Sequence, residues 1–414
     1  MINYKFSIIT PTHKYTSYLD ELFECIKNQT YTNWEWILCL NGRFKTHQIP
    51  EEIKNHPQVK VNTNYVSNQT KVGYYKLHAF NMGEGDVLVE VDHDDLISLN
   101  CLEELNIAYQ NQETGFVYSN CLIYDLREDS NPVARQPWVA KNGWTYTKEK
   151  FRGEEYIVHD TFPATSHTLS IIWYAPDHIR SWRKNIYHQV GGHNPELSIC
   201  DDQELMIRTY MVTKFYHIPK TLYYYRFLPS TELNTQTERL DDIQVQTFEL
   251  LNQYGVALAQ RDAELNNLLS IELNEYLYKE DVDLNDKIPL DDDSVGVLSA
   301  LHVLQKLKNP IKSMKEIYRV LKDGGWAIIE VPSTDGRGAF QDPTHVSYWN
   351  QNSFLYYTDK THSVFIDNTD IKFQVFRNET VYLNEWSKEN NCPVTIAWLC
   401  AIKSDKKRPH PVNI

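Results

Sequence analysis

The stretch LVEVDHDDLIS, at residues 88–98, joins a strand-like apolar run to a dense acidic cluster. The run is interrupted only by Glu90, and Asp92, Asp94 and Asp95 follow it closely. Carboxylates about 5–6 Å apart repel one another by roughly 3 kcal/mol at an effective dielectric of about 20. A divalent cation would relieve this repulsion, because it binds carboxylate oxygens and leaves positions open for a substrate diphosphate. A solvated acidic turn is the alternative interpretation of this stretch.

Alternating strand and helix patterns surround the acidic stretch. We expect strands at 5–13, 34–42 and 59–65, and helices at 18–30 and 71–86. Strands alternating with helices predict a parallel α/β sheet with right-handed crossovers, in which ligands bind beyond the carboxyl ends of the strands. The acidic cluster lies at such an end. Residues 115–230 are less regular, and they predict mixed strands and loops over this first sheet.

The pattern changes twice further along the chain. Residues 233–278 carry periodic Leu, Ile and Tyr with a single glycine, Gly255, which predicts one or two long connecting helices. An α/β pattern returns at 279–405, and a charged tail follows at 406–414. With a first domain at 1–232, we expect two α/β domains joined by a helical connector.

Charge and cysteine content narrow the class of protein. The chain has 414 residues with 41 Lys and Arg and 55 Asp and Glu, a net charge of −14. This balance argues against a broad basic face for nucleic acid, although a local basic groove is left open. The seven cysteines include no CxxC pair, which favours a reducing compartment, and we expect a cytoplasmic protein. We expect no secretory signal and no membrane span, and a homo-oligomer is left open.

Three stretches, taken in order and spacing, resemble a family 2 glycosyltransferase of the GT-A fold over residues 4–230. They are SIITPTHKYTSYLDELFECIKNQTYTNWEWILCLNG, GEGDVLVEVDHDDLI and GGHNPELSICDDQELMIR. The resemblance implies a Rossmann-like mixed sheet and transfer of a hexose or pentose from a nucleotide-sugar donor, expected to be UDP-linked. The donor-binding residues that it implies are Thr10, Pro11, Thr12, Asn41, Lys76, Asp92, His93 and Arg226.

The resemblance assigns individual roles in the donor site. The sequence Asp92-His93-Asp94 corresponds to the DXD motif, in which Asp94 is the main ligand for Mn²⁺ or Mg²⁺ and Asp92 faces the ribose or the metal. Asp95 is expected to cap the following turn. Asn41 stands where the family usually carries an Asp that contacts the base.

Two basic residues complete the implied donor site. Lys76 stands where the family usually carries an Arg. Arg226 is a candidate for the diphosphate, expected on a mobile loop.

The same resemblance places the catalytic base at Asp202. An inverting transfer needs one carboxylate that deprotonates the acceptor hydroxyl as it attacks the anomeric carbon. Neighbouring negative charge and partial burial are expected to raise the pKa of this carboxyl. Alternatively, Asp201 and Asp202 are simply the acidic first turn of a helix. The acceptor site is expected to involve Gly191, Gly192, His193 and Trp182, with Trp173 and His178 as further candidates.

The C-terminal pattern, including IKSMKEIYRVLKDGGWAIIEVP, resembles the back half of a class I methyltransferase. The glycine-rich turn of the front half is missing, so this domain is a degenerate Rossmann-like fold and S-adenosylmethionine is not expected to bind. The acceptor is expected to be a saccharide or glycan. A hydroxylated DNA base, as in viral DNA modification, and a catalytically inactive sugar-binding or scaffold protein are left open.

Overall fold

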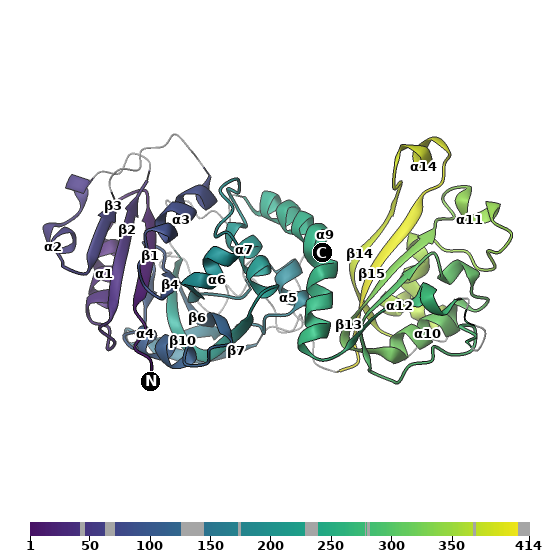
Figure 1. Ribbon diagram of the computed structural model, residues 1–414, viewed down its shortest axis with the longest axis horizontal. Coiled ribbons are helices and arrows are strands. Elements are labelled where there is room, and N and C mark those ends of the chain that lie inside the picture. The colour runs from purple at the N-terminus through teal and green to yellow at the C-terminus, as the bar shows by residue number, and fades with distance from the viewer. Residues whose placement is uncertain are drawn as a thin grey trace. The chain divides into compact units, whose positions relative to one another are not determined.

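The computed structural model describes residues 1–41, 46–62, 71–125, 145–172, 175–227, 239–277, 279, 282–366 and 370–404. It divides into two compact units, Met1–Tyr254 and Gly255–Lys406, each built on its own sheet (Figure 1). The boundary falls inside helix α9 (Leu240–Leu265). None of the helices in the described ranges combines the length and the apolar content needed to cross a membrane.

The first unit is a mixed sheet in the order β3-β2-β1-β4-β9-β6-β10-β5, with β8 paired to β6 and β7 to β8. Strands β1 to β4 are parallel, as predicted, whereas β9 is antiparallel to both β4 and β6. The expectation that residues 115–230 lie over the sheet is wrong, because their strands continue it. The strands are β1 (Phe6–Thr12), β2 (Trp34–Leu40), β3 (Val59–Asn62), β4 (Val87–Glu90), β5 (Leu96–Ile97), β6 (Thr114–Asp125), β7 (Tyr146–Phe151), β8 (Glu154–His159), β9 (Arg180–Arg183) and β10 (Lys214–Phe227).

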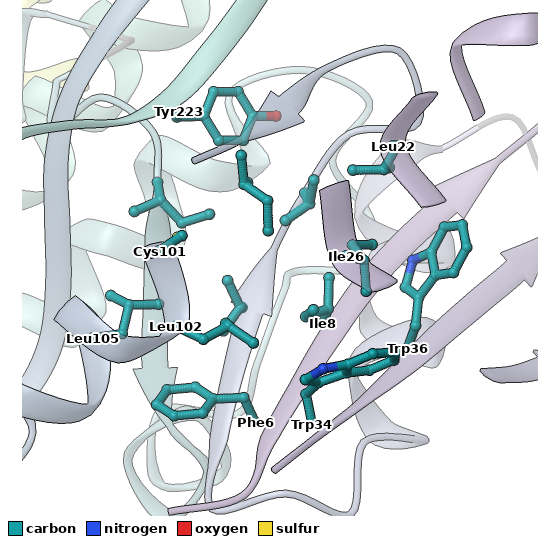
Figure 2. Packing of buried hydrophobic residues seen from close by; sticks show 14 of the residues in the cluster. Phe6, Ile8, Leu22, Ile26, Trp34, Trp36, Cys101, Leu102, Leu105 and Tyr223 are labelled. Carbon is teal, nitrogen blue, oxygen red and sulfur yellow. The ribbon is translucent and has the colours of Figure 1, made fainter. Parts of the chain in front are cut away.

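Helices cover this sheet through apolar faces. Helix α1 buries Leu19, Leu22, Phe23 and Ile26, which recur at the spacing of one helical face. Figure 2 shows side chains of α1, α4, β1 and β2 meeting in one core, with Tyr223 of β10 among them. The helices of this unit are α1 (Ser17–Lys27), α2 (Glu51–Lys54), α3 (Val72–Asn81), α4 (Cys101–Ala108), α5 (Ser166–Ile171), α6 (Lys184–Gln189) and α7 (Asp201–Tyr210).

The second unit is a five-stranded sheet in the order β11-β12-β13-β15-β14. Its first three strands are parallel, and β15 runs antiparallel to both of its neighbours. The strands are β11 (Leu269–Glu272), β12 (Val295–Leu301), β13 (Leu321–Pro332), β14 (Phe373–Val381) and β15 (Val394–Ala401). The helices are α10 (Pro310–Val320), α11 (Gly338–Gln341), α12 (Leu355–Thr358), α13 (Lys360–Ser363) and α14 (Glu385–Glu389).

The segment predicted as a helical connector, 233–278, is helical over a shorter range. Helix α9 ends at Leu265, and Asn267 follows with φ 54°, a left-handed conformation that Asn tolerates better than most residues. The chain then enters β11, which pairs with β12. The second sheet therefore begins before residue 279.

A close backbone approach in the first unit positions α3 against the segment that precedes α7. The Gly73 N–H donates to the Leu197 carbonyl oxygen at 3.0 Å, and a Cβ at residue 73 would overlap the carbonyl oxygen of Asn194. We expect Gly73→Ala to lower the free energy of unfolding by about 1–3 kcal/mol, measured by urea unfolding.

The neighbouring Val72→Ala is the matched control, because Val72 is 39% exposed. Its effect should stay within about 0.5 kcal/mol. Equal effects of the two variants would contradict the close packing of α3 at Gly73.

Candidate active site

The acidic loop that follows β4 is bound to strand β10. The Tyr223 hydroxyl accepts the Asp92 N–H at 3.1 Å and donates to Asp95 Oδ2 at 2.7 Å. Asp95 Oδ1 accepts the Arg226 N–H at 2.7 Å. Asp95 is almost fully buried, and a buried carboxylate requires donors. The prediction that Asp95 caps a turn is therefore wrong, since its carboxylate joins the loop to β10.

A buried ion pair lies beneath this loop. Glu90, the last residue of β4, has no exposed surface, and Lys76 Nζ of α3 lies 2.6 Å from its Oε1. The same Nζ lies 3.4 Å from Asp201 Oδ2 at the start of α7. Burial acts to lower the pKa of Lys76, but Asp201 and Glu90 outweigh it and raise this pKa well above its ordinary value. Lys76, predicted to bind the donor, thus places its ammonium between two carboxylates.

Asp202, the predicted base, is paired with Arg180 of β9. Arg180 Nη1 forms an ion pair with Asp202 Oδ2, while Asp202 Oδ1 accepts the Gln203 N–H at 2.8 Å. Burial acts to raise the pKa of Asp202, but Arg180 and Lys76 outweigh it and the pKa is lowered. The expectation of a raised pKa is wrong, because sequence reasoning did not foresee Arg180.

Asp202 is also the more accessible of the two acids at the start of α7. Its side chain is 23% exposed, against 7% for Asp201. Burial raises the pKa of Asp201 to about 6, although Lys76 opposes the shift. The two neighbouring acids therefore differ in accessibility and in the direction in which their pKa is shifted.

The loop after β4 and the start of α7 share one set of cations. Burial raises the pKa of Asp92 to about 7, and Glu90 and Asp94 add to this, whereas Lys76 and Arg180 act to lower it. The same two cations lower the pKa of Asp202. Asp92 and Asp202, separated by more than a hundred residues, therefore lie within electrostatic reach of one buried pair of cations.

The carboxyl ends of β1 and β2 carry the residues predicted to cradle the nucleoside. Thr10 is fully buried and its Oγ1 accepts from Trp36 Nε1 at 3.0 Å, so its side chain belongs to the core. Thr12 Oγ1 donates to the Lys14 carbonyl oxygen at 2.9 Å, and Pro11 is half-buried. The Asn41 N–H donates to the Thr12 carbonyl oxygen at 2.8 Å. Thr12, Pro11 and Asn41 therefore lie together at the carboxyl ends of β1 and β2.

Asn41 presents an acceptor at this edge. Its Oδ1 is buried, and within the described part of the chain it has no hydrogen-bond partner.

His93 is nearly buried, its ring packs edge to face against His13 at 5.3 Å, and its Nδ1 lies 4.0 Å from Asp94 Oδ1.

Arg226 lies in strand β10 rather than on a mobile loop, which corrects that part of the prediction. Its fully buried guanidinium lies 3.3 Å from both carboxylate oxygens of Glu21 and 4.0 Å from the ring centre of Tyr18. Arg152 also pairs with Glu21, at 2.6 Å. The guanidinium is held by α1, and its backbone N–H is used by Asp95.

Of the four predicted acceptor residues, only Gly191 is accessible, because Gly192, Trp182 and His193 are all buried. Gly191 is exposed with φ 82°, and Gly192 has φ 68°. Trp182 and His193 have no exposed surface, so no acceptor can contact them and the prediction is wrong for both. Trp182 Nε1 donates to Thr209 Oγ1 at 3.1 Å, which makes it a core residue.

The two further acceptor candidates were His178 and Trp173. His178 is nearly buried and stacks on the Tyr223 ring, with ring centres 4.7 Å apart. Trp173 lies outside the described residues.

The donor set after β4 suits a hard divalent cation. Within the described ranges, no group of three or more His, Cys, Asp or Glu side chains is arranged to hold a metal ion. Asp92 and Asp94 supply two carboxylates, which fits a cation that takes its remaining ligands from a diphosphate and water. Burial raises the pKa of Asp92, with Glu90 and Asp94 adding to the shift, so its charged form lacks the compensation that a bound cation would supply.

Sequence reasoning did not foresee the roles of several residues that organise the site: Glu90, Arg180, Asp201 and Tyr223. Glu90 carried a signal, because an acid inside an apolar strand is buried and requires a partner. Arg180 and Tyr223 carried none, since their partners are 22 residues away for Arg180 and 128 for Tyr223.

Residues 7–170 match the model of the glycosyl transferase family 2, and residues 250–329 match the model of a methyltransferase domain. These matches confirm the predicted resemblance to a family 2 glycosyltransferase followed by a methyltransferase domain. They also agree with the predicted fold class, a GT-A-like mixed sheet followed by a second α/β sheet. No curated protein matches the chain.

Similarity to solved structures is low. TarS residues 1–349 of S. aureus in complex with UDP-GlcNAc is 17% identical with a TM-score of 0.44, over 64% of this chain and 72% of that one. A mannosyltransferase of Pyrobaculum calidifontis in complex with GDP-Man and Mn²⁺ is 15% identical with a TM-score of 0.40, over 60% of this chain and 64% of that one. These scores are too low to support an argument about function.

The buried ion pair predicts a large effect at Lys76. Lys76→Met would leave Glu90 and Asp201 without their cation, and we expect the free energy of unfolding to fall by about 3–5 kcal/mol. Lys71→Met, at the N-cap of the same helix, is the control, because Lys71 and its partner Glu196 are 37% and 76% exposed. Its effect should stay below about 1 kcal/mol in the same urea titration. Similar losses in the two variants would rule out a buried pair.

His193 predicts a pH dependence of stability. Burial lowers its pKa to about 3 in the folded state, against an ordinary value of 6.5. Below pH 6.5 the unfolded chain binds a proton that the folded chain does not, so stability falls as pH falls towards 3. Between pH 7.5 and 5, wild type should lose about 2 kcal/mol more than His193→Gln. Parallel pH curves for the two proteins, measured by urea unfolding, would contradict a buried neutral imidazole.

Proposed function

We propose that this protein is an inverting, metal-dependent glycosyltransferase that moves a sugar from a UDP-sugar to a hydroxyl of a saccharide acceptor. One observation carries the proposal. Lys76 Nζ lies 2.6 Å from Glu90 Oε1, at the end of β4, and 3.4 Å from Asp201 Oδ2, next to Asp202, which supports one shared site for the acidic loop and the start of α7. The match to the family 2 glycosyltransferase model supports the use of a nucleotide-sugar donor.

Asp202 is the proposed general base. Its pKa is lowered, so its carboxylate is ionised at neutral pH, and it is the accessible acid of α7. As the acceptor oxygen bonds to the anomeric carbon, the bond from that carbon to the diphosphate oxygen breaks, and the hydroxyl proton passes to Asp202. Attack from the side opposite the diphosphate inverts the anomeric configuration. The hydroxyl becomes acidic as the new bond forms, which allows a base of low pKa to accept its proton.

Asp92 and Asp94 would hold the divalent cation, Mn²⁺ or Mg²⁺. When bound, such a cation neutralises the charge of the departing diphosphate. The protein's own contribution is to keep both carboxylates on one short loop after β4, where Tyr223 and the backbone of Arg226 bind it.

Asn41 supports the choice of uridine. Its buried Oδ1 has no partner in the described residues, and it lies at the edge where the nucleoside is expected. A buried acceptor without a donor costs free energy, so a ligand N–H is the natural partner. The N3–H of uracil supplies such a donor.

The proposal is tested by incubating the protein with Mn²⁺ and a panel of sugar nucleotides. We expect slow release of UDP from one UDP-sugar, loss of that release in Asp94→Ala, and faster release with a saccharide acceptor. If no donor is hydrolysed and none raises the melting temperature, the proposal fails. If the sugar of a labelled donor is transferred to a hydroxylated DNA base and not to saccharides, the acceptor is a DNA base instead of a saccharide.

Asp202→Asn tests the base directly. The amide cannot accept the acceptor proton, and we expect kcat to fall by about 10²–10⁴-fold while the KM for the donor changes little. Glu113→Gln is the control, because Glu113 is 68% exposed and pairs only with Lys214 among the described residues. Turnover by Asp202→Asn at the rate of this control would assign the base elsewhere.

A further inference from the structure

Tyr223 is a buried residue whose hydroxyl joins the two ends of the acidic loop. The hydroxyl accepts the Asp92 N–H at 3.1 Å and donates to Asp95 Oδ2 at 2.7 Å. Both donor and acceptor capacities of this hydroxyl are therefore used, and both partners flank Asp94. Figure 2 shows the ring of Tyr223 among the core side chains of the first unit.

The position of this hydroxyl is itself constrained. The Tyr223 ring has no exposed surface and stacks on His178 with an interplanar angle of 22°. The backbone of Tyr223 pairs with Ile97 of β5, the strand that follows the loop. Strand β10 also supplies the Arg226 N–H to Asp95. One strand therefore binds the loop at Asp92 and at Asp95, and it also pairs with β5, which follows the loop.

The loop needs such a restraint because its charges repel. Asp92, Asp94 and Asp95 lie within four consecutive residues, and the repulsion among them favours an open loop with its carboxylates apart. A divalent cation requires the opposite, namely two carboxylates held at a narrow separation. Partners that orient metal ligands from outside typically change metal affinity by about 10–100-fold when removed.

We propose that Tyr223 is a positioning residue that presets the loop from Asp92 to Asp95 for the divalent cation of the donor site. This inference rests on the proposed function. Tyr223 has no exposed surface with which to touch a donor or an acceptor, and it acts through the backbone of Asp92 and the carboxylate of Asp95. Removal of its hydroxyl should weaken the binding of the divalent cation and leave the KM for the acceptor unchanged.

Tyr223→Phe tests this inference, because it removes the hydroxyl and keeps the ring. With UDP present, we expect the Kd for Mn²⁺, measured from free Mn²⁺ by electron paramagnetic resonance, to rise about tenfold. The kcat at saturating Mn²⁺ and the KM for the acceptor should stay within about twofold. A general loss of structure would not produce this split.

Tyr224→Phe is the matched control. Tyr224 is the next residue on β10, so its side chain points to the opposite face of the sheet, where its ring stacks on Phe151 at 4.3 Å. Its Kd for Mn²⁺ should equal that of wild type.

Asp95→Asn is the second variant, and it tests the positioning of the loop by β10 if Tyr223→Phe does not fold. An amide cannot accept from both the Tyr223 hydroxyl and the Arg226 N–H through separate oxygens, so the same rise in Kd is expected.

The outcomes separate this inference from the proposed function. An active wild type together with a Tyr223→Phe protein of unchanged Mn²⁺ affinity overturns the positioning role alone. If wild type neither binds Mn²⁺ with UDP nor turns over any donor, the proposed function fails and the positioning role with it.

Discussion

The buried ion pair between Lys76 and Glu90 is the interaction on which the candidate site depends. Glu90 ends β4, a strand enclosed by β1 and β9, where an unpaired carboxylate would be very costly. Lys76 compensates that charge and also reaches Asp201. The pair therefore ties the central strand to the helix that carries Asp202. The acidic loop begins two residues after Glu90, so its starting point is set by the same contact.

The carboxyl groups of Asp202, on α7, and Asp92, on the acidic loop, have pKa values shifted in opposite directions. Asp202 is already paired with Arg180 and its pKa is lowered, so its carboxylate remains ionised. Asp92 is buried beside Glu90 and Asp94, and its pKa is raised to about 7. This contrast suits a base that works without a bound cation and a loop that gains from one. Neighbouring acids thus acquire distinct roles from the cations that surround them.

Sequence reasoning singled out Asp92, Asp94 and Asp202 as candidates because strand ends and motif spacing are local properties. It misplaced residues whose roles depend on distant partners. Trp182 and His193 were predicted to line the acceptor site, but β9 continues the sheet and buries Trp182 beneath α7. Arg226 was predicted on a mobile loop, yet it belongs to β10 and its guanidinium binds Glu21 of α1. A sequence pattern that is irregular along the chain gave no indication that these strands extend the first sheet.

The amino-acid sequence by itself determined the succession of strands and helices, the acidic loop at the end of β4 and the likeness to two families, because periodicity and motif spacing are read along the chain. Only the tertiary structure decided which charges meet. Asp95 accepts the backbone N–H of Arg226, 131 positions away, and Lys76 pairs with acids at the end of β4 and the start of α7. Burial and ion pairing are set by neighbours in space, and these determine which acids are ionised and which hold the loop.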